Sequence, residues 1–390
     1  MTTMNLPPPP QKRRIAVVHD WLVAQRGGES VLEAILDWVP EAEVFTLFYD
    51  PKKVSERIRR SRVRAFWKGD STRFPLKHYR ALLPIYNKLY DRFPTAKYDL
   101  VLSSSHCLAH FVPQPKRGLH LNYVFAPMRY VWDQHEQYLG GGWLQDWVLK
   151  RNQKRLQGLD LSAARRVDHH AADSHHIAAK VQQFWGRTAE VIHPFVRLDQ
   201  FPFSEVQRVG NVPYFLVVSA LVPYKRIDRA ILGAHQSGKR LVIVGDGPER
   251  PKLERFVSEL SSRDGFRVEF KGWRPTPEVA KLYREAQAFL FPGTEDFGIT
   301  PLEAQACGTP VIAYNEGGAL ETILQNETGV FFSGETEEER VENLARVMRR
   351  WNTADWNPVA CRELAEQFSR ERFQQNYVDW ALSKWNDASF

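Results

Sequence analysis

The sequence has 390 residues, of which 43% are hydrophobic, so it is long enough for two ordinary domains that each bury a core. Its three cysteines (Cys107, Cys307 and Cys361) form no C-x-x-C pair, which excludes a disulfide scaffold and a structural zinc site and predicts a reducing, cytoplasmic compartment. No apolar run approaches the roughly 18 to 20 residues of a membrane span, and no signal-peptide core follows the proline-rich N-terminus, so neither a transmembrane helix nor a standard secretion signal is expected.

The net charge of +7 is unevenly distributed along the chain. Residues 1–200 carry 30 Lys and Arg against 19 Asp and Glu, whereas the remainder carries 23 against 27. Within this basic half, residues 52–97 hold 14 basic and 3 acidic side chains, interleaved with aromatic and aliphatic ones. Such a mixture is typical of a surface that binds an anionic membrane, where each cation contributes about 1 kcal/mol. A solvated face over an ordinary core is the alternative, and nucleic acid is not expected because no recognised module accompanies the charge.

Apolar runs alternate with helical patterns through the first half of the chain, after a leader over residues 1–11 that we expect to be disordered. The pattern ESVLEAILDWV (29–39) has helical spacing. The runs themselves are continuous and short, as buried parallel strands are. Strands are predicted at 14–20, 44–49, 99–105 and 119–126.

The second half of the chain repeats this alternation, so the sequence predicts an α/β fold with two doubly wound domains. The proline-punctuated segment 193–213 is interpreted as the linker, which gives domains at 12–198 and 199–371. The amphipathic pattern 369–385 has no strand partner and predicts a terminal helix. Strands in this half are predicted at 214–220, 240–245, 267–272, 288–293 and 310–315.

In open α/β sheets, ligands bind beyond the carboxyl ends of the strands. The first predicted strand leads to Gly27 and Gly28 at the start of a helix, where free amides and the helix dipole favour a phosphate; a simple turn is the alternative. No G-x-G-x-x-G follows, which disfavours a nicotinamide-dependent enzyme. The first strand of the second half delivers Lys225 and Arg226 to the same kind of loop. Two adjacent cations suit a diphosphate, since one charge pair at about 4 Å contributes roughly 4 kcal/mol before desolvation; a surface pair is the alternative.

The stretch GTEDFGITPLEAQACGTPVIAYNEGG (293–318) places Glu295 and Glu303 eight positions apart. The T-x-x-E spacing of Thr300 to Glu303, with Pro301 as the first helical residue, predicts a capping box, which explains Glu303 structurally. Gly308 is placed to end that helix. Glu295 caps nothing and is therefore predicted to bind a ligand. The backbone of residues 297–299 enters the helix N-terminus and offers amides to an anion or to sugar oxygens.

This stretch, E-x7-E with Phe-Gly inside it and then P-L-E-A-x-A-x-G-x-P-V-I-A, resembles the retaining GT-B glycosyltransferases of family 4. Further motifs carry the resemblance over essentially the whole chain: VHDWLVAQRGGESVLEAI, SSSHC, PMRYVWDQH, VSALVPYKRID, VGDGPER and TGVFF. Together they are similar to the bacterial mannosyltransferases of exopolysaccharide and O-antigen assembly. The resemblance implies two Rossmann-like domains facing across a cleft, with the nucleotide sugar on the C-terminal domain and the acceptor on the N-terminal one. It also implies that a C-terminal helix, 372–390, crosses back onto the first domain.

The resemblance also implies roles for individual residues. Lys225 and Arg226 would neutralise the leaving diphosphate with help from the Gly28 amide, and Glu295 would contact the donor sugar. Glu303 would accept hydrogen bonds from the ribose. The remaining donor contacts would come from the backbone of Gly272 and Trp273 near the nucleobase and of Phe297, Gly298 and Ile299 near the sugar and β-phosphate. The implied reaction is front-face substitution with retention, which requires no metal and no cofactor because fixed cations and helix N-termini stabilise the charge.

Two positions depart from the wider family. Phe125 stands where many members carry a His, and Ala220 stands where an Arg is frequent, which affects how the donor sugar is recognised. The donor that the resemblance favours is GDP-mannose. Two alternatives stay open: a donor linked to UDP or ADP, or a carbohydrate-binding protein of this fold with little catalysis.

The acceptor side is predicted from residues that follow strands of the first domain. Asp20, His106, Arg129 and Asp133 are candidates to line it, with an i, i+4 ion pair as the alternative for Arg129 and Asp133. The basic segment 52–97 would suit a polyprenyl-diphosphate-linked glycan and a peripheral position on the inner face of the cytoplasmic membrane.

Overall fold

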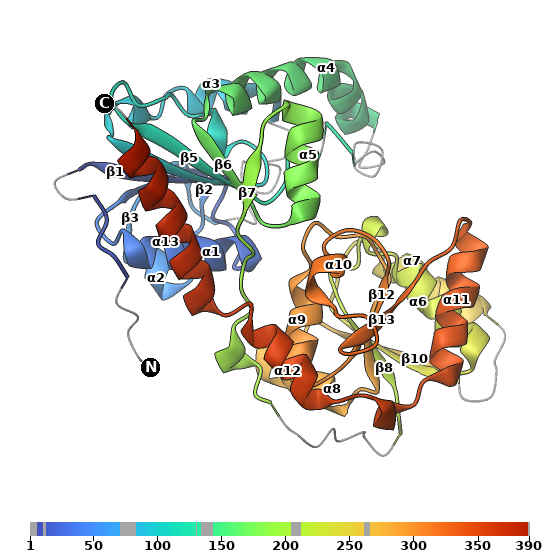
Figure 1. Cartoon of the computed structure of the whole chain (residues 1–390). Coiled ribbons are helices and arrows are strands. Elements are labelled where there is room, and N and C mark those ends of the chain that lie inside the picture. The colour runs from blue at the N-terminus through green and yellow to red at the C-terminus, as the bar shows by residue number, and fades with distance from the viewer. Residues whose placement is uncertain are drawn as a thin grey trace. The chain divides into compact units, whose positions relative to one another are not determined.

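The computed structural model describes residues 6–10, 13–70, 83–129, 131–133, 143–203, 212–260 and 266–388. The chain forms two compact units (Figure 1). The first unit comprises Met1–Pro194 together with Arg370–Phe390, and the second comprises Phe195–Ser369. Each unit is built on its own parallel sheet with helices on both faces, which is the predicted fold class.

The sheet of the first unit has seven strands in the order β3-β2-β1-β4-β5-β6-β7, all paired in parallel. The order reverses between β1 and β4, whose register runs from Ile15 opposite Leu100 to His19 opposite Ser104. The residues that follow these two strands therefore meet at one point of the sheet edge. The strands are β1 (Ile15–His19), β2 (Glu43–Tyr49), β3 (Arg62–Lys68), β4 (Leu100–Ser105), β5 (Leu119–Val124), β6 (His169–Ala172) and β7 (Ala189–Val191).

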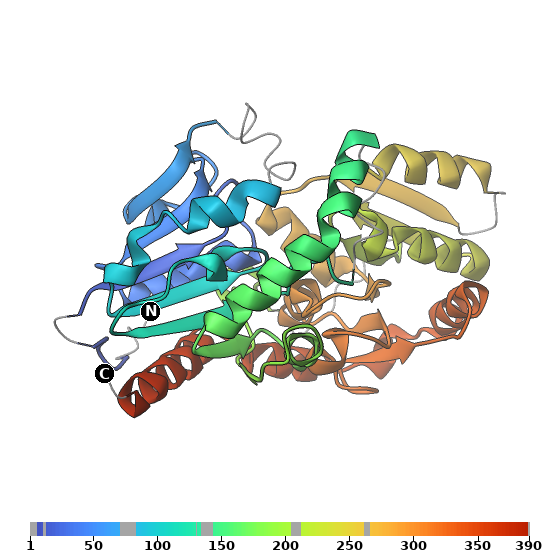
Figure 2. The same ribbon diagram turned by 90° about the horizontal axis from the view of Figure 1, so that it is seen from above.

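Helices cover both faces of this sheet because its central strands are apolar on both sides. Ala16 and Val18 point into a core shared with α3 and α4, and both views place these two helices on one face (Figures 1 and 2). Helix α1 covers the other face. The helices of the first unit, apart from the last, are α1 (Gly27–Trp38), α2 (Glu56–Arg59), α3 (Leu83–Tyr90), α4 (Trp143–Arg166) and α5 (His175–Trp185).

The last helix, α13 (Arg370–Asp387), packs beside α1 of the first unit (Figure 1). Gln374 donates from Nε2 to the carbonyl of Ala34 at 3.1 Å. Arg370 pairs with Asp37 at 2.6 Å, near the end of α1. Helix α13 thus contributes to the core of the first unit.

The sheet of the second unit has six strands in the order β10-β9-β8-β11-β12-β13, again all parallel. This is the Rossmann order, and it reverses between β8 and β11. The strands are β8 (Phe215–Val218), β9 (Arg240–Val244), β10 (Arg267–Gly272), β11 (Ala288–Phe291), β12 (Val311–Tyr314) and β13 (Gly329–Phe332).

Side chains alternate between two cores across this sheet, as the strand period of two requires. Leu216 packs toward α8, α9 and α12, whereas Phe215 and Val217 pack toward α6, α7 and α11. The helices are α6 (Ile227–Ser237), α7 (Arg250–Glu259), α8 (Thr276–Glu285), α9 (Ile299–Ala306), α10 (Ala319–Thr322), α11 (Glu337–Arg350) and α12 (Pro358–Glu366).

The basic segment 52–97 contains the unpredicted strand β3, and residues 71–82 of the segment lie outside the described residues. Phe66 and Trp67 of β3 pack against the core, and the Trp67 ring stacks on Phe48 at 5.0 Å. These aromatic side chains therefore contribute to folding, while the neighbouring cations Arg62 and Arg64 face solvent on an edge strand. Among the described residues, no helix has both the length and the hydropathy needed to cross a bilayer.

Candidate functional site

The strand order of the second sheet reverses between β8 and β11, and this place is its switch point. Two of the predicted site residues meet there. Lys225 ends a short 3-10 turn (Pro223–Lys225) after β8, and Glu295 lies in the loop after β11. The Lys225 ammonium forms an ion pair with the Glu295 carboxylate, and the two side chains are only 15% and 19% exposed. A charged pair is therefore held at the edge where ligands bind in this type of sheet.

The loops that carry this pair touch because glycines allow a close approach. A Cβ on Gly293 would lie 2.5 Å from the carbonyl oxygen of Tyr224 and 2.8 Å from the carbonyl carbon of Lys225, so only glycine fits there. From the loop after β12, the Gly318 amide donates to the Glu295 carbonyl at 2.9 Å. The backbone on both sides of the ion pair is thus fixed by packing.

Helix α9 begins at Ile299, shortly after Glu295 in the same loop, and its N-cap is Gly298 with φ of 87°. No side chain caps the first turn. The amides at this end and the positive end of the helix dipole are therefore placed beside the Lys225–Glu295 pair.

The predicted capping box is wrong. Pro301 is the third residue of α9 and not the first, because the left-handed Gly298 starts the helix two residues earlier than the T-x-x-E spacing implies. Glu303 consequently lies beyond the first turn and caps nothing. Gly308 does follow the end of the helix, with φ of 83°.

Glu303 is instead a partly buried carboxyl that accepts a hydrogen bond from the Tyr283 hydroxyl at 3.1 Å. Burial raises the pKa of Glu303 to about 7; the Tyr283 hydrogen bond opposes this shift, and the nearby Glu295 charge adds to it. Burial likewise raises the pKa of Tyr283 far above its ordinary value. Glu303 is thus a carboxyl that changes charge near neutral pH and lies close to Glu295.

Arg226 is adjacent to Lys225 but its guanidinium is engaged elsewhere. It adopts a left-handed conformation with φ of 51° and forms a two-point pair with Asp228, at 3.1 and 3.0 Å. It also donates to Glu337 of α11 at 2.9 Å. These carboxylates raise the pKa of Arg226 despite the opposing effect of burial.

Glu337 receives a second arginine, Arg229, which is 3% exposed. Arg229 donates to both Glu337 oxygens at 2.8 and 2.9 Å and to the carbonyl of Pro292 at 2.5 Å. Its guanidinium also stacks on the Tyr314 ring at 4.6 Å. Although burial raises it, the pKa of Glu337 falls to about 2 because the two arginines hydrogen-bond its charged form. This network ties α6 and α11 to the end of β11, next to Gly293.

Two predicted donor residues lie at the end of another strand. Gly272 is the last residue of β10 with φ of 67°, and Trp273 follows it with 71% of its surface exposed. Trp273 lines an open hollow of about 760 Å³ that also includes Pro275 and Arg284. An exposed indole of this size is available for stacking.

In the first unit, the switch point is organised by Asp20, a fully buried carboxylate. Its two oxygens accept four backbone amides, from residues 106 to 109, at 2.6 to 2.9 Å. It also lies 3.0 Å from Nδ1 of His106. Asp20 thus anchors the loop after β4, and His106 is the partly exposed member of this pair.

Gly28 packs beside residues at the carboxyl ends of β1 and β5. A Cβ on Gly28 would lie 3.5 Å from the ring of Phe125 and 3.7 Å from His19. His19 bonds to the Ser104 hydroxyl at 2.8 Å, and burial lowers its pKa to about 4, so it is neutral at physiological pH. The start of α1 already holds a carboxylate, because Glu29 accepts from the amide of Arg26 at 2.8 Å.

The remaining acceptor-side candidates follow β5. Asp133 pairs with Lys180 of α5 at 2.5 Å, and Arg129 precedes Asp133 in the segment after the strand. Of the predicted site residues, the structure therefore pairs Lys225 with Glu295 and Asp20 with His106. Asp133 is paired with Lys180 of α5, which had not been predicted.

Three residues of the second-unit site had not been predicted: Tyr283, Arg229 and Glu337. Arg229 lies on α6, the helix that follows Lys225. Glu337 and Tyr283 reach the site from segments far away in sequence, and no local pattern marks them.

The chain is similar to known proteins in sequence over part of its length and in fold over most of it. Residues 200–366, nearly all of the second unit, match the family described as "Glycosyl transferases group 1". A GDP-mannose-dependent alpha-(1-6)-phosphatidylinositol monomannoside mannosyltransferase of Mycobacterium tuberculosis is 31% identical over 201 residues, which is 43% of this chain and 52% of that protein. The chain therefore spans about half the length of the curated relative it matches.

Among solved structures, sucrose-phosphate synthase from Thermosynechococcus elongatus is similar with a TM-score of 0.74 at 19% identity, covering 96% of this chain and 100% of that one. Anabaena Alr3699/HepE in complex with UDP-glucose gives a TM-score of 0.66 at 17% identity, covering 95% and 99%. The two Rossmann-like domains are those of the GT-B fold, and residues 200–366 are similar to a family of glycosyl transferases.

Replacement of Glu337 by Gln tests the arginine network. The neutral amide leaves the buried charge of Arg229 without its counter-charge, so we expect the free energy of unfolding to fall by about 2 kcal/mol. Because the folded pKa lies below the ordinary 4.5, Glu337 stabilises the protein above about pH 4.5, and this stability is lost as the pH falls toward 2. In urea titrations of the whole chain at several pH values, the Glu337→Gln variant should lack the loss of stability that protonation of Glu337 causes. Glu338→Gln, at an exposed neighbour, is the matched control; equal stability of the two variants would contradict the network's role.

Proposed function

We propose that this chain is a retaining glycosyltransferase that transfers a hexose from a nucleotide sugar to a glycan acceptor. The observation that carries the proposal is the Lys225–Glu295 ion pair at the switch point of the second sheet, beside the uncapped start of α9. The match of residues 200–366 to a glycosyltransferase family supports it.

In this proposal the donor's diphosphate binds where positive charge is already fixed. Lys225 exchanges its partner Glu295 for the phosphate oxygens, and the amides of Gly298 and Ile299 bind them further. Glu295, once released, accepts hydrogen bonds from the donor sugar, while Glu303 accepts them from the ribose. Gly272 and Trp273 take the nucleobase.

Arg226 enters the proposal as a positioning residue. Its guanidinium is bound by Asp228 and Glu337, so it holds the Lys225 turn in place and does not need to touch the phosphate.

The proposed chemistry is substitution on the front face of the anomeric carbon. The bond between that carbon and the diphosphate oxygen breaks while the acceptor hydroxyl oxygen bonds to the same face, and the leaving oxygen takes the hydroxyl proton. The protein contributes placement of the two reactants and stabilisation of the charge on the diphosphate. The fixed cation and helix amides supply this stabilisation, so the proposal includes no metal and no cofactor.

We assign mannose, carried by GDP, as the donor on the strength of the likeness to a GDP-mannose-dependent enzyme. A UDP-linked sugar is the second candidate, because a solved structure of the same fold is described with UDP-glucose. The acceptor we propose is a polyprenyl-diphosphate-linked glycan of bacterial surface polysaccharide synthesis. Asp20 would hold His106 toward it, and Arg129 and Asp133 lie after the next strand.

Lys225→Ala tests the charge-stabilising role. We expect turnover, measured as donor hydrolysis or transfer in the presence of EDTA, to fall by roughly 10² to 10³, as when one preorganised charge-stabilising group is lost. Lys252→Ala, at a 74% exposed lysine of the same unit, is the control and should keep normal turnover. Normal turnover by Lys225→Ala would remove this residue from the mechanism. Glycan binding without any turnover by the unmodified protein would favour a carbohydrate-binding role.

Glu303 predicts a pH dependence of donor binding. Ribose hydroxyls donate to the ionised carboxylate, and the pKa of about 7 leaves Glu303 largely protonated at lower pH. The affinity for a nucleotide sugar should therefore rise several-fold between about pH 6 and about pH 8. Glu303→Gln, which cannot titrate, should bind weakly and without this dependence in calorimetric titrations. Wild-type affinity in that variant would exclude the ribose contact.

The peripheral membrane position rests on charge, because the described aromatic side chains of β3 pack inward. The test uses four exposed cations of this segment: Lys52, Lys53, Arg59 and Arg60. Their replacement by Gln should abolish co-sedimentation with anionic vesicles at low salt. The control replaces Lys281, Arg346, Arg349 and Arg350 of the second unit. Equal loss in both variants, or no vesicle binding by the unmodified protein, would contradict the proposal.

A further inference from the structure

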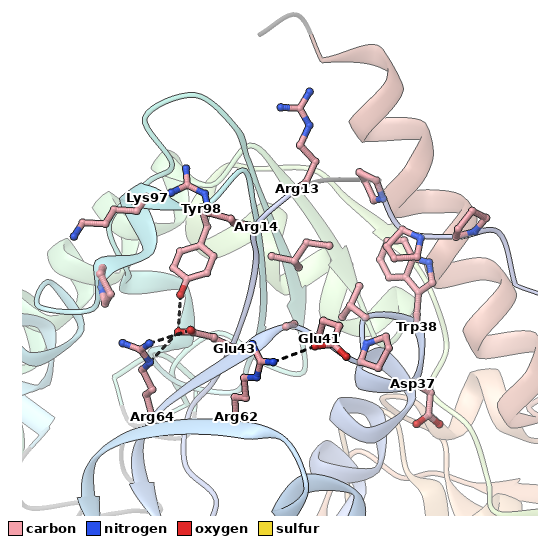
Figure 3. Close-up of a pocket in the computed structure, with 18 residues that line it drawn as sticks. Arg13, Arg14, Asp37, Trp38, Glu41, Glu43, Arg62, Arg64, Lys97 and Tyr98 are labelled. Carbon is pink, nitrogen blue, oxygen red and sulfur yellow. Dashed lines mark hydrogen bonds and ion pairs between the residues drawn. The ribbon is translucent and has the colours of Figure 1, made fainter.

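A pocket of about 990 Å³ lies at the amino-terminal edge of the first sheet, away from every residue considered so far for catalysis (Figure 3). Its lining includes the first residues of three strands, Ile15 of β1, Glu43 of β2 and Arg62 of β3. Asp20 and His106 follow the opposite ends of the strands, and the five residues of β1 separate the two edges by roughly 16 Å. The volume falls in the range of small-molecule sites, roughly 300 to 1,000 Å³.

The three carboxylates of this pocket are already bound. Glu43 accepts from the Tyr98 hydroxyl at 2.7 Å and pairs with Arg64 at 2.8 Å, as Figure 3 shows. Glu41 pairs with Arg62 at 3.3 Å. Asp37 is held by two arginines that lie outside the lining. The negative charge in the pocket is therefore compensated within the protein.

The pocket's cations exceed these carboxylates. Arg14 forms an ion pair with Asp99 at 3.8 Å, a distance that leaves its guanidinium without a hydrogen bond to that carboxylate, and its side chain is 67% exposed. Lys97 is exposed and has no ion-pair partner in the described part of the chain. Figure 3 shows both beside Tyr98, together with Arg64. The fork of an arginine and the ammonium of a lysine are the donors that bind phosphate groups in proteins.

Apart from Arg13, the rest of the wall is largely apolar. Pro8, Pro9 and Pro10 line the pocket, and the indole of Trp38 fixes this segment by donating to the Pro7 carbonyl at 3.0 Å. With Ile15 and the Tyr98 ring, these prolines offer surface to the organic part of a ligand.

From this arrangement we propose that the pocket is a second ligand site, which binds a phosphate-bearing small molecule through Arg14 and Lys97. It is separate from the donor site of the proposed function and does not depend on it. The bound molecule would lie against Trp38 at the end of α1, the helix beside which α13 packs.

The test uses inorganic pyrophosphate as the probe, in calorimetric titrations of the full chain. In the Lys225→Ala variant, which removes the cation of the donor site, one class of binding should remain. Adding Arg14→Gln and Lys97→Gln should weaken that binding by at least about 10-fold, because two charge-assisted contacts are lost. Both side chains are exposed, so the thermal unfolding midpoint should stay at the parent value.

The matched control adds Arg349→Gln and Arg350→Gln to Lys225→Ala, which changes the net charge equally at two exposed arginines outside the pocket. This control should keep the affinity of the Lys225→Ala parent. Equal weakening in both variants would show unspecific attraction to a basic surface and overturn the proposal. Loss of all pyrophosphate binding in Lys225→Ala alone would also overturn it, since every bound anion would then belong to the donor site.

Discussion

The second-unit site depends on the hydrogen bonds that the buried guanidinium of Arg229 makes. This guanidinium joins the Glu337 carboxylate of α11 to the Pro292 carbonyl at the end of β11, and it does so from α6, the helix that follows Lys225. Three segments distant in sequence are thereby fixed where the order of the sheet reverses. Gly293 then allows the loop after β11 to lie directly on the turn that ends in Lys225. The Arg229 hydrogen bonds and the close approach at Gly293 together fix the backbone that carries Lys225 and Glu295. The ion pair is therefore positioned by the backbone as well as by the two side chains.

The first unit solves the same problem with a carboxylate. Asp20 follows β1 and accepts the amides of residues 106–109, so it orders the loop after β4 in the way that Arg229 orders the loop after β11. A buried carboxylate that receives several backbone hydrogen bonds needs no counter-ion of its own. Each sheet thus has a buried charged residue near its switch point, with a more exposed ionisable residue, His106 or Lys225, held next to it. This arrangement places the functional groups at the edge where an open α/β sheet binds ligands.

The sequence predicted the two α/β domains and the central strands, because continuous apolar runs mark buried parallel strands. It did not predict β3, whose alternating Arg62 and Arg64 made it look like part of a basic surface, nor the short strands β7 and β13. The local pattern Thr300 to Glu303 gave a capping box, yet the positive φ of Gly298 starts the helix earlier. Lys225 and Glu295 could be identified from their places after strands. Their pairing, and the capture of Arg226 by Glu337, depend on contacts between distant segments that no spacing in the sequence reveals.

We propose that the second unit binds a nucleoside diphosphate through the site built around Lys225 and Glu295. Calorimetric titration of the full chain, without metal, against GDP, UDP and ADP tests this binding. We expect saturable binding with GDP preferred, followed by slow hydrolysis of GDP-mannose. Preferred binding of UDP or ADP would keep the site and change the donor. If none of the three binds, the site does not recognise a nucleoside diphosphate, and the proposed function is wrong.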